Sequence, residues 1–399
     1  MQTYTQMQDS GVAWLGDIPT EWQMLRIGQL FSQRNEKVSD KDFEPLSVTK
    51  KGIVPQLENA AKTDNGDNRK KVLKGDYVIN SRSDRKGSSG LSRLDGSVSL
   101  INTVLAESKL HPRFAHHLLR SYPFQEEFYR WGQGIVADLW STNYQRMKSI
   151  QLPVPDYETQ ERIANYLDEE TALIDDLIAK QQRLLALLEE KRRATITHAV
   201  TRGLNPIVEL KETNIPWFGQ IPAHWKLQPI KAFAQINNGS DYKNIQADDS
   251  EGYPVIGSGG QFTSATKFVY DGKSVLFGRK GTIDKPLYFE GKFWTVDTMF
   301  WSKIDEERII PKYLYYAALS IPYEYYQTKT ALPSMTQSNL LNHQLAIPDM
   351  KEQEQIISKL ERKQREFDKL NQIIRTQVSL LKERRTSLIS HAVTGKIKV

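Results

Sequence analysis

The chain has 399 residues, of which 39% are hydrophobic and 26% charged, and its formal net charge at pH 7 is +6. This composition is typical of a globular protein, and the length predicts at least two domains. The sequence contains no cysteine, which excludes disulfide bonds and thiolate metal sites. No apolar run approaches the roughly 18 residues of a membrane helix, and the N-terminus does not resemble a secretory signal, so we expect a cytoplasmic protein.

Short sequence motifs occur twice in the chain. Residues 14–22 (WLGDIPTEW) and 217–225 (WFGQIPAHW) are identical at five of nine positions, and the dipeptide Pro-Asp stands at both 155 and 348. Repetition of this kind, in register, predicts a tandem duplication. Similarity is weakest between the shared motifs, which favours two copies that bind different targets.

Each copy begins with a mixed α/β part. Runs of β-branched and aromatic residues between glycine-containing turns predict strands at Tyr77–Ile79, Val98–Val104, Ser274–Phe277 and Phe293–Phe300. Proline suits the first turn of a helix, so we expect helices that begin at Pro112 and Pro311.

Each copy ends in a long segment of good helix formers, because residues 157–202 and 350–394 contain neither glycine nor proline. Forty residues of helix span about 60 Å. Apolar residues at seven-, three- and four-residue spacings predict a coiled-coil seam. The predicted seam residues are Leu167, Ile174, Leu177, Leu184 and Leu188 in the first segment and Leu360, Phe367, Leu370 and Leu381 in the second. The first segment is net negative and the second net positive, which favours their lying side by side.

The predicted fold is therefore α+β, with two mixed α/β domains and two long helices in a tandem repeat. The predicted domains are residues 1–155 and 204–348, and the predicted spacer helices are residues 156–203 and 349–399.

Common catalytic motifs are missing from the sequence. Gly272-Lys273-Ser274 resembles the end of a phosphate-binding loop, but Lys267 stands where the first glycine of that loop is required. We find neither the cofactor loop nor the Asn/Asp-Pro-Pro-aromatic tetrad of an adenine methyltransferase. We therefore expect no catalytic residue, no metal site and no cofactor bound by this chain.

Basic loops that also carry hydroxyl and amide side chains are typical of DNA-binding surfaces. Lys and Arg neutralise phosphates, and Arg, Asn and Gln can form paired hydrogen bonds with base edges. The predicted DNA-binding residues of the first domain are Lys50, Lys51, Arg69, Lys70, Arg82, Arg85 and Lys86. Those of the second domain are Ser258, Gln261, Arg279, Lys280 and Thr282. Each loop alone also fits a solvated turn, but the recurrence of arginine at 82 and 279 favours DNA.

Residues 253–261 (YPVIGSGGQ), 275–282 (VLFGRKGT) and 293–298 (FWTVDT) resemble the target-recognition domain of type I restriction-modification specificity subunits. The repeated tryptophan motif and the helix starts Gln160-Glu-Arg-Ile163 and Gln353-Glu-Gln-Ile356 are similar to the shared regions of that family. The resemblance covers essentially the whole chain. The first domain departs from it, because Arg82-Ser-Asp-Arg85 replaces the compact Gly-Arg-Lys-Gly turn.

The resemblance implies a double-stranded DNA reader in which each recognition domain binds one half of a split site. It also implies that the long helices pair antiparallel with pseudo-two-fold symmetry and set the gap between the half-sites. Two modification subunits would bring S-adenosylmethionine and methylate adenine, and two restriction subunits would use ATP and Mg²⁺ to translocate and cleave DNA.

Three alternatives are compatible with the residues alone. A solitary repressor-like protein would bind its DNA site without partners. A fused restriction enzyme would need catalytic motifs that the sequence lacks. A coiled-coil scaffold would show no sequence-specific DNA binding.

Overall fold

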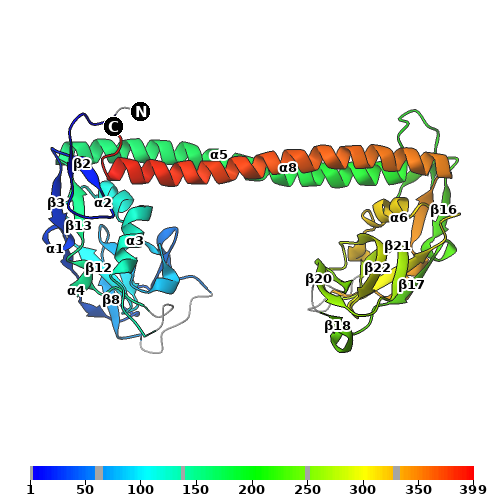
Figure 1. The fold of residues 1–399 in the computed structure, drawn as a ribbon, viewed down its shortest axis with the longest axis horizontal. Helices are drawn as coiled ribbons and strands as arrows, with labels where there is room; N and C mark the ends of the chain where they lie inside the picture. The colour runs from blue at the N-terminus through cyan, green and yellow to red at the C-terminus, as the bar shows by residue number, and fades with distance from the viewer. Residues whose placement is uncertain (1–2, 59–65, 136–139, 248–251, 327–332) are drawn as a thin grey trace. The chain divides into compact units, whose positions relative to one another are not determined.

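The computed structural model describes residues 3–58, 66–135, 140–247, 252–326 and 333–399. It divides into two compact units. Unit 1 comprises Met1–Gln181 and Thr376–Val399, and unit 2 comprises Gln182–Arg375. Each unit therefore contains one mixed domain and part of each long helix (Figure 1).

The domain of unit 1 is built from small antiparallel sheets. A four-stranded sheet has the order β10-β9-β12-β4, a three-stranded sheet has the order β11-β8-β5, and β1-β2, β3-β13 and β6-β7 form two-stranded sheets. The strands are β1 (Met7–Asp9), β2 (Asp17–Pro19), β3 (Gln23–Arg26), β4 (Ser32–Gln33), β5 (Lys37–Val38), β6 (Leu46–Thr49), β7 (Gly52–Pro55), β8 (Arg69–Val72), β9 (Tyr77–Asn80), β10 (Ser89–Leu91), β11 (Gly96–Val98), β12 (Asn102–Ala106) and β13 (Gln151–Val154). The helices are α1 (Ile27–Leu30), η1 (Ser83–Arg85), α2 (Pro112–Leu118), α3 (Tyr122–Arg130) and α4 (Tyr144–Met147).

The domain of unit 2 is built around one seven-stranded sheet of order β17-β23-β21-β22-β19-β20-β18, with the pairs β14-β15 and β16-β24 beside it. Its strands are β14 (Leu210–Glu212), β15 (Gln220–Pro222), β16 (Lys226–Pro229), β17 (Ala234–Asn238), β18 (Gln246–Ala247), β19 (Tyr253–Gly257), β20 (Gly260–Ala265), β21 (Tyr270–Gly278), β22 (Leu287–Thr295), β23 (Met299–Ile304) and β24 (Gln344–Ile347). Its short helices are η3 (Ile230–Ala232), η4 (Lys243–Ile245), α6 (Pro311–Ala318), η5 (Tyr323–Tyr325) and α7 (Gln337–Asn342).

The predicted α+β fold class is confirmed, as are the helices beginning at Pro112 and Pro311. Two predicted strands were too long, because a turn interrupts each. The segment predicted as Val98–Val104 breaks after Val98, where the Asn102 side chain donates to the Ser99 carbonyl at 3.1 Å. The segment predicted as Phe293–Phe300 breaks after Thr295, in a turn closed by the Met299 N–H and the Val296 carbonyl.

The two long helices are α5 (Tyr157–Arg202) and α8 (Met350–Val393). Each begins after an aspartate whose carboxylate accepts the backbone N–H three residues later, at 2.8 Å for both Asp156 and Asp349. This is a typical N-cap. A glycine with positive φ follows each helix, Gly203 at 75° directly after α5 and Gly395 at 72° two residues after α8, a conformation that glycine adopts without strain. None of the helices within the described residues is long and apolar enough to cross a membrane.

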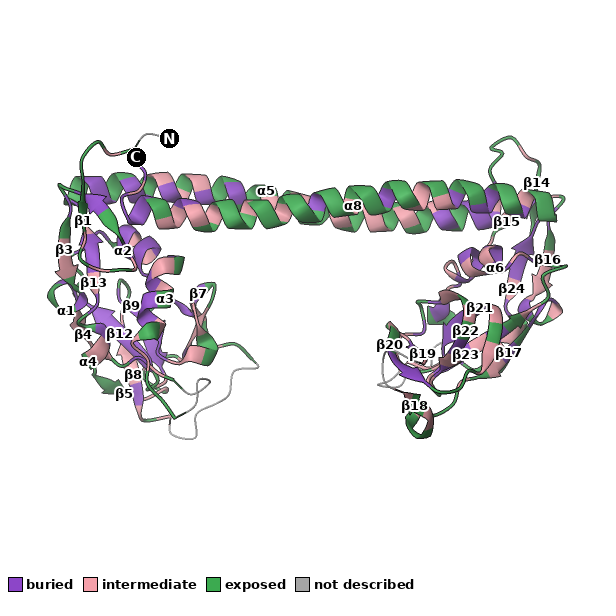
Figure 2. Ribbon diagram, viewed as in Figure 1, coloured by how far each residue is buried: buried purple, intermediate pink, exposed green. Residues whose placement is uncertain are grey.

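The helices pack antiparallel within each unit. In unit 1, Ile174 in the first half of α5 shares a core with Leu388 near the end of α8. In unit 2, Ile196 near the end of α5 shares a core with Leu360 near the start of α8. The start of each helix therefore lies beside the end of the other. Buried residues of both helices concentrate near the helix ends, where the helices pack against the domain of each unit (Figure 2).

In the middle of the coiled-coil seam, the predicted positions are wrong by one residue along the chain. Leu177, Leu184 and Leu370 are 42%, 43% and 45% exposed. The more buried positions follow a strict alternation of four and three residues, and the same frame recurs 193 residues later in α8. The observed positions are 167, 171, 174, 178, 181, 185 and 188 in α5 and 360, 364, 367, 371, 374, 378 and 381 in α8. Two apolar neighbours stand at 177–178 and at 184–185, and the second of each pair faces the partner helix.

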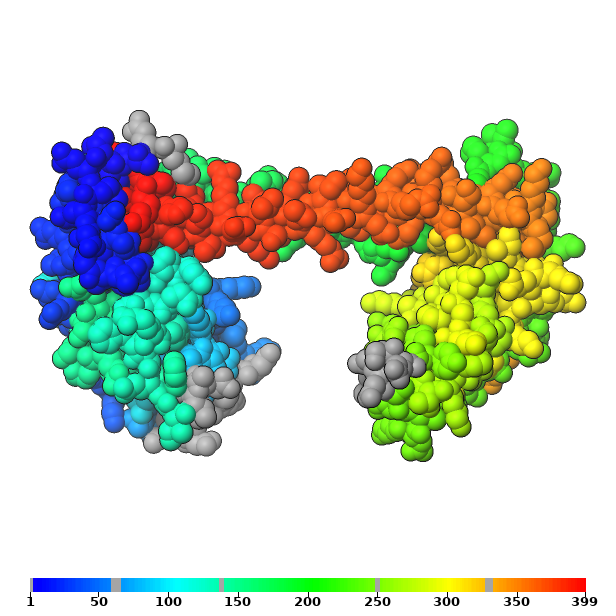
Figure 3. Space-filling model, viewed as in Figure 1, coloured from blue at the N-terminus to red at the C-terminus, as the bar shows by residue number. Residues whose placement is uncertain are grey.

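The C-terminal residues complete the core of unit 1. Ala392, Val393 and Ile397 are buried in the same core as Ile18 and Trp22. Figure 3 shows the end of the chain against the N-terminal residues. The N- and C-terminal segments of the chain therefore fold together.

Candidate nucleic-acid interface

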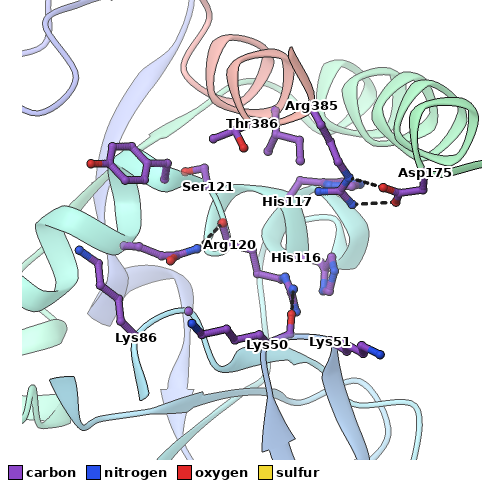
Figure 4. Close-up of a pocket in the computed structure, with 14 residues that line it drawn as sticks. Lys50, Lys51, Lys86, His116, His117, Arg120, Ser121, Asp175, Arg385 and Thr386 are labelled. Carbon is purple, nitrogen blue, oxygen red and sulfur yellow. Dashed lines mark hydrogen bonds and ion pairs between the residues drawn. The ribbon is translucent and has the colours of Figure 1, made fainter. Parts of the chain in front are cut away.

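A cleft of about 680 Å³ in unit 1 gathers Lys50, Lys51, Lys86 and Arg120 (Figure 4). We call it the basic cleft. Its walls come from the β6–β7 turn, from α2 and α3, and from Arg385 and other residues of the long helices. Three of the predicted DNA-binding residues are thus brought together.

A tight hairpin turn presents the two lysines. Thr49 pairs with Gly52, and the Thr49 hydroxyl accepts the Lys51 N–H at 3.0 Å and donates to the Gly52 carbonyl at 2.9 Å. The guanidinium of Arg120 donates to the backbone carbonyls of Lys50 and Ser89, both at 2.5 Å. Arg120, which the sequence analysis missed, therefore holds the lysine turn against β10.

The charges of the basic cleft differ in their availability. Lys86 pairs with Glu126, and the Arg385 Nε lies 2.9 Å from the Asp175 carboxylate. Within the part of the chain that the structure describes, no carboxylate pairs with Lys50 or Lys51, and both are exposed. These two lysines are the cations available to an anionic ligand.

The histidines beside the basic cleft are neutral at pH 7. Burial lowers the pKa of His116 to about 3, and its Nδ1 accepts the Leu91 N–H at 3.3 Å. Burial also lowers the pKa of His117, whose Nε2 lies 2.7 Å from the Asp168 carboxylate. The positive potential of the cleft therefore comes from Lys and Arg.

A second cleft of about 630 Å³ in the same domain is polar. It is lined by Lys50, Arg85, hydroxyl groups and amides, among them Thr49, Gln56, Asn80, Ser88 and Asn102. Amide and hydroxyl groups can donate to and accept from base edges. Lys50 lines both clefts, so a cation that can neutralise phosphate adjoins groups that can hydrogen-bond with base edges.

The two arginines of the Arg82–Arg85 loop share one carboxylate. The Arg82 Nε lies 3.1 Å and the Arg85 Nε 3.6 Å from Asp84. Arg82 lines a third cleft, together with Lys70 and Ser141, and not the basic cleft. The structure therefore divides the basic residues of the first domain among three surfaces.

Two predicted DNA-binding residues are held by the protein itself. Arg69 is only 4% exposed, and its guanidinium donates to the Ser97 hydroxyl at 2.8 Å and carbonyl at 3.0 Å. The Lys70 ammonium donates to the Asn102 carbonyl at 2.7 Å. Burial lowers the pKa of both groups. We correct the prediction for Arg69: although it lines the second cleft, its side chain is nearly buried and its guanidinium joins β8 to β11.

In unit 2, Ser258 lies in the β19–β20 turn and Gln261 on β20, while Arg279, Lys280 and Thr282 lie in the loop after β21. The turn 296–298 contacts both segments. The Val296 N–H donates to the Ile256 carbonyl at 3.3 Å, and the Arg279 N–H donates to the Thr298 carbonyl at 2.8 Å.

The loop after β21 is compact because Gly278 starts it. A Cβ at Gly278 would lie 2.1 Å from the Thr282 carbonyl oxygen, so only glycine fits there. The Arg279 guanidinium lies 5.9 Å from the Phe300 ring centroid, and one of its N–H groups donates to the Asp297 carbonyl at 3.3 Å. Lys280 is exposed. The protein therefore holds the Arg279 cation of this loop in place, whereas the Lys280 cation is exposed to water.

No group of three His, Asp or Glu side chains in the described ranges is arranged to hold a metal ion.

The comparisons with known proteins agree with this chemistry. Residues 222–380 match the model of the family described as type I restriction modification DNA specificity domain. A chain solved in work on complex assembly and conformational transition of the type I R-M system has a TM-score of 0.74 and 14% identity, covering 94% of this chain and 98% of that one. The HsdS subunit from Thermoanaerobacter tengcongensis has a TM-score of 0.54 and 14% identity, covering 95% and 98%. No curated protein matches significantly.

The matched segment, residues 222–380, includes the seven-stranded sheet of unit 2 and the loop after β21. Residues 222–380 therefore match the type I restriction-modification specificity family, and the chain as a whole shares the fold of the two solved chains. The family model confirms the resemblance to a DNA specificity domain for residues 222–380, and the solved structures confirm the fold of the whole chain.

Proposed function

We propose that this chain is the specificity subunit of a type I restriction-modification complex, in which each mixed domain reads one half of a split DNA site. The match of residues 222–380 to the DNA specificity domain carries the proposal. The tryptophan motif, the proline-started helix and the capped long helix of that domain recur in the first copy. The first copy adds the basic cleft and the polar cleft.

The chain itself contributes recognition and no catalysis. Its partners are two modification subunits, which supply S-adenosylmethionine, and two restriction subunits, which supply ATP and Mg²⁺. The complex works on cytoplasmic DNA. The chemistry of this chain supports its role in DNA recognition, because cations, amides and hydroxyls line its clefts.

Two equivalent exposed positions on the long helices support two identical partners. Leu177 and Leu370 correspond through the 193-residue offset, as do Leu187 and Leu380, and all four are exposed. Unit 1 contains Leu177 and Leu380, and unit 2 contains Leu370 and Leu187. Each unit therefore offers one member of each pair, on opposite helices.

Reconstitution tests the proposal. The purified chain with a modification subunit and S-adenosylmethionine should methylate adenine at one split DNA sequence, whereas either protein alone should not. Methyl transfer by the isolated chain would contradict a recognition-only role. Tight site-specific binding by the chain alone, with no gain from the modification subunit, would favour the repressor-like alternative.

A further inference from the structure

One buried glutamine lies at the start of each long helix. Gln160 is 3% exposed and Gln353 1% exposed, and each stands four residues after its capping aspartate. A buried side-chain amide requires hydrogen-bond partners, since an unsatisfied polar group in the interior destabilises the fold.

Both glutamines form the same two kinds of hydrogen bond, with partners at equivalent positions of the two units. In unit 1 the Gln160 Nε2 donates to the Pro155 carbonyl at 2.8 Å, and its Oε1 accepts the His111 N–H at 2.8 Å. In unit 2 the Gln353 Nε2 donates to the Pro348 carbonyl at 3.1 Å, and its Oε1 accepts the Ile310 N–H at 2.9 Å.

These partners belong to different elements. The proline carbonyls directly follow β13 and β24, the last strands of the domains, and the N–H groups directly precede α2 and α6. Each amide therefore joins three parts at one point: the last strand, a short helix and the long helix. Since the donor and acceptor of an amide have fixed directions, the bonds define an angle as well as a distance.

A second contact stabilises each joint farther along the helix. Arg113 on α2 lies 2.8 Å from Asp168 on α5, and Lys312 on α6 pairs with Glu361 on α8. Asp168 and Glu361 each follow their glutamine by eight residues, which is about 12 Å of helix. Two contacts at this separation resist the pivoting that a single contact would permit.

We propose that Gln160 and Gln353 are positioning residues for DNA recognition. They hold each recognition domain at one angle on its long helix and thereby fix the gap between the two half-sites. This inference rests on the proposed function. Its support is that two copies with divergent reading loops retain the same pair of hydrogen bonds at this joint.

The test uses the reconstituted complex and a set of DNA sites that differ only in gap length, one base pair at a time. Gln353→Ala removes both hydrogen bonds that fix the angle of the domain, so the preference for the native gap over its neighbours should fall about tenfold or more. The preferred half-sites should not change. Gln355→Ala, an exposed position on the same helix, is the matched control and should keep the wild-type profile.

A purely structural role gives a different result. If Gln353→Ala lowers methylation equally at every gap length, so that the profile keeps its shape, the inference is overturned. Gln353→Met fills a similar volume without either hydrogen bond, so it should broaden the profile as alanine does and serves if the alanine variant is insoluble. Gln160→Ala should broaden the same profile from the other half-site. A wild-type complex that methylates no site would instead contradict the proposed function itself.

Discussion

At the scale of single residues, Lys50 and Lys51 are the clearest phosphate-binding candidates of the first domain. Each lysine that contacts a phosphate releases a condensed counterion, so Lys50→Ala combined with Lys51→Ala should flatten the dependence of log affinity on log salt by about 2. DNA affinity of the reconstituted complex, measured across a salt series, checks this. Lys41→Ala, an exposed lysine outside the clefts, should leave the slope unchanged. An unchanged slope in the double variant would remove the basic cleft from the DNA interface.

His343 predicts a pH-dependent stability of unit 2. It stacks on Trp217 with ring centroids 5.5 Å apart, accepts or donates a 2.7 Å bond with the Tyr326 hydroxyl, and burial lowers its pKa to about 4. The unfolded chain, with an ordinary histidine pKa near 6.5, binds the proton more readily. Stability contributed by neutral His343 is therefore complete above pH 6.5 and decreases as the pH falls toward 4.

Urea unfolding followed by tryptophan fluorescence at pH 7.5 and pH 5 measures this effect. His343→Gln should reduce the loss of unfolding free energy between the two pH values. His198→Gln, an exposed histidine of the same unit, should leave the loss unchanged. Equal losses in both variants would assign the acid sensitivity to other groups.

The exposure of a cationic side chain could be predicted from the sequence in a tight turn but not on a strand. The side chains of the Lys50-Lys51 turn have no protein core beside them in which they could be buried. Arg69, in contrast, belongs to the run Arg69-Lys70-Lys71, which reads as a solvated surface. It is buried because Ser97 on the neighbouring strand offers two acceptors, and that pairing between distant segments is not visible in the sequence.

At the scale of elements, the long helices were predictable because their ends carry local signals. Asp156 and Asp349 cap the starts, and Gly203 and Gly395 end the helices. The phase of the seam was not fully predictable. Where Leu177 precedes Ile178, both neighbours are apolar, and packing against the other helix selects the second.

The corrected seam allows a sharp test of whether the helices set the gap between half-sites. A seven-residue insertion after Ile178 and another after Asn371 keep the four-three alternation in phase. Seven residues lengthen a helix by about 10 Å. Since DNA rises about 3.4 Å per base pair, the gap should grow by at most about three base pairs.

Methylation mapping of the reconstituted complex measures the gap. Both half-site sequences should stay unchanged, because the reading loops are not altered. A methylated site with the original gap would show that the helices do not determine the spacing.

At the scale of the whole molecule, the two units differ in continuity. Unit 2 is one stretch of chain, Gln182–Arg375, whereas unit 1 requires Thr376–Val399 as well as the N-terminal residues. Deletion of residues 376–399 removes the buried side chains of Leu388, Ala392 and Val393 from the core of unit 1. Loss of one large buried aliphatic residue alone costs about 2–5 kcal/mol.

The truncated chain should therefore lose the fold of unit 1 and keep that of unit 2. Limited proteolysis with peptide mapping should show new cleavage within residues 3–135 and continued protection of the β-sheet of unit 2. Equal protection of both units would show that the C-terminal segment is dispensable.

The discontinuity of unit 1 has a consequence for biosynthesis. The ribosome releases residues 1–181 before unit 2, but the helical segment that packs in the same core as Ile18 and Trp22 leaves it after unit 2. The first domain must wait through the synthesis of the entire second unit with part of its core uncovered, while the second unit closes on contiguous chain. Maturation of unit 1 therefore runs against the usual N-to-C order, because its core is complete only once residues 376–399 have been synthesised.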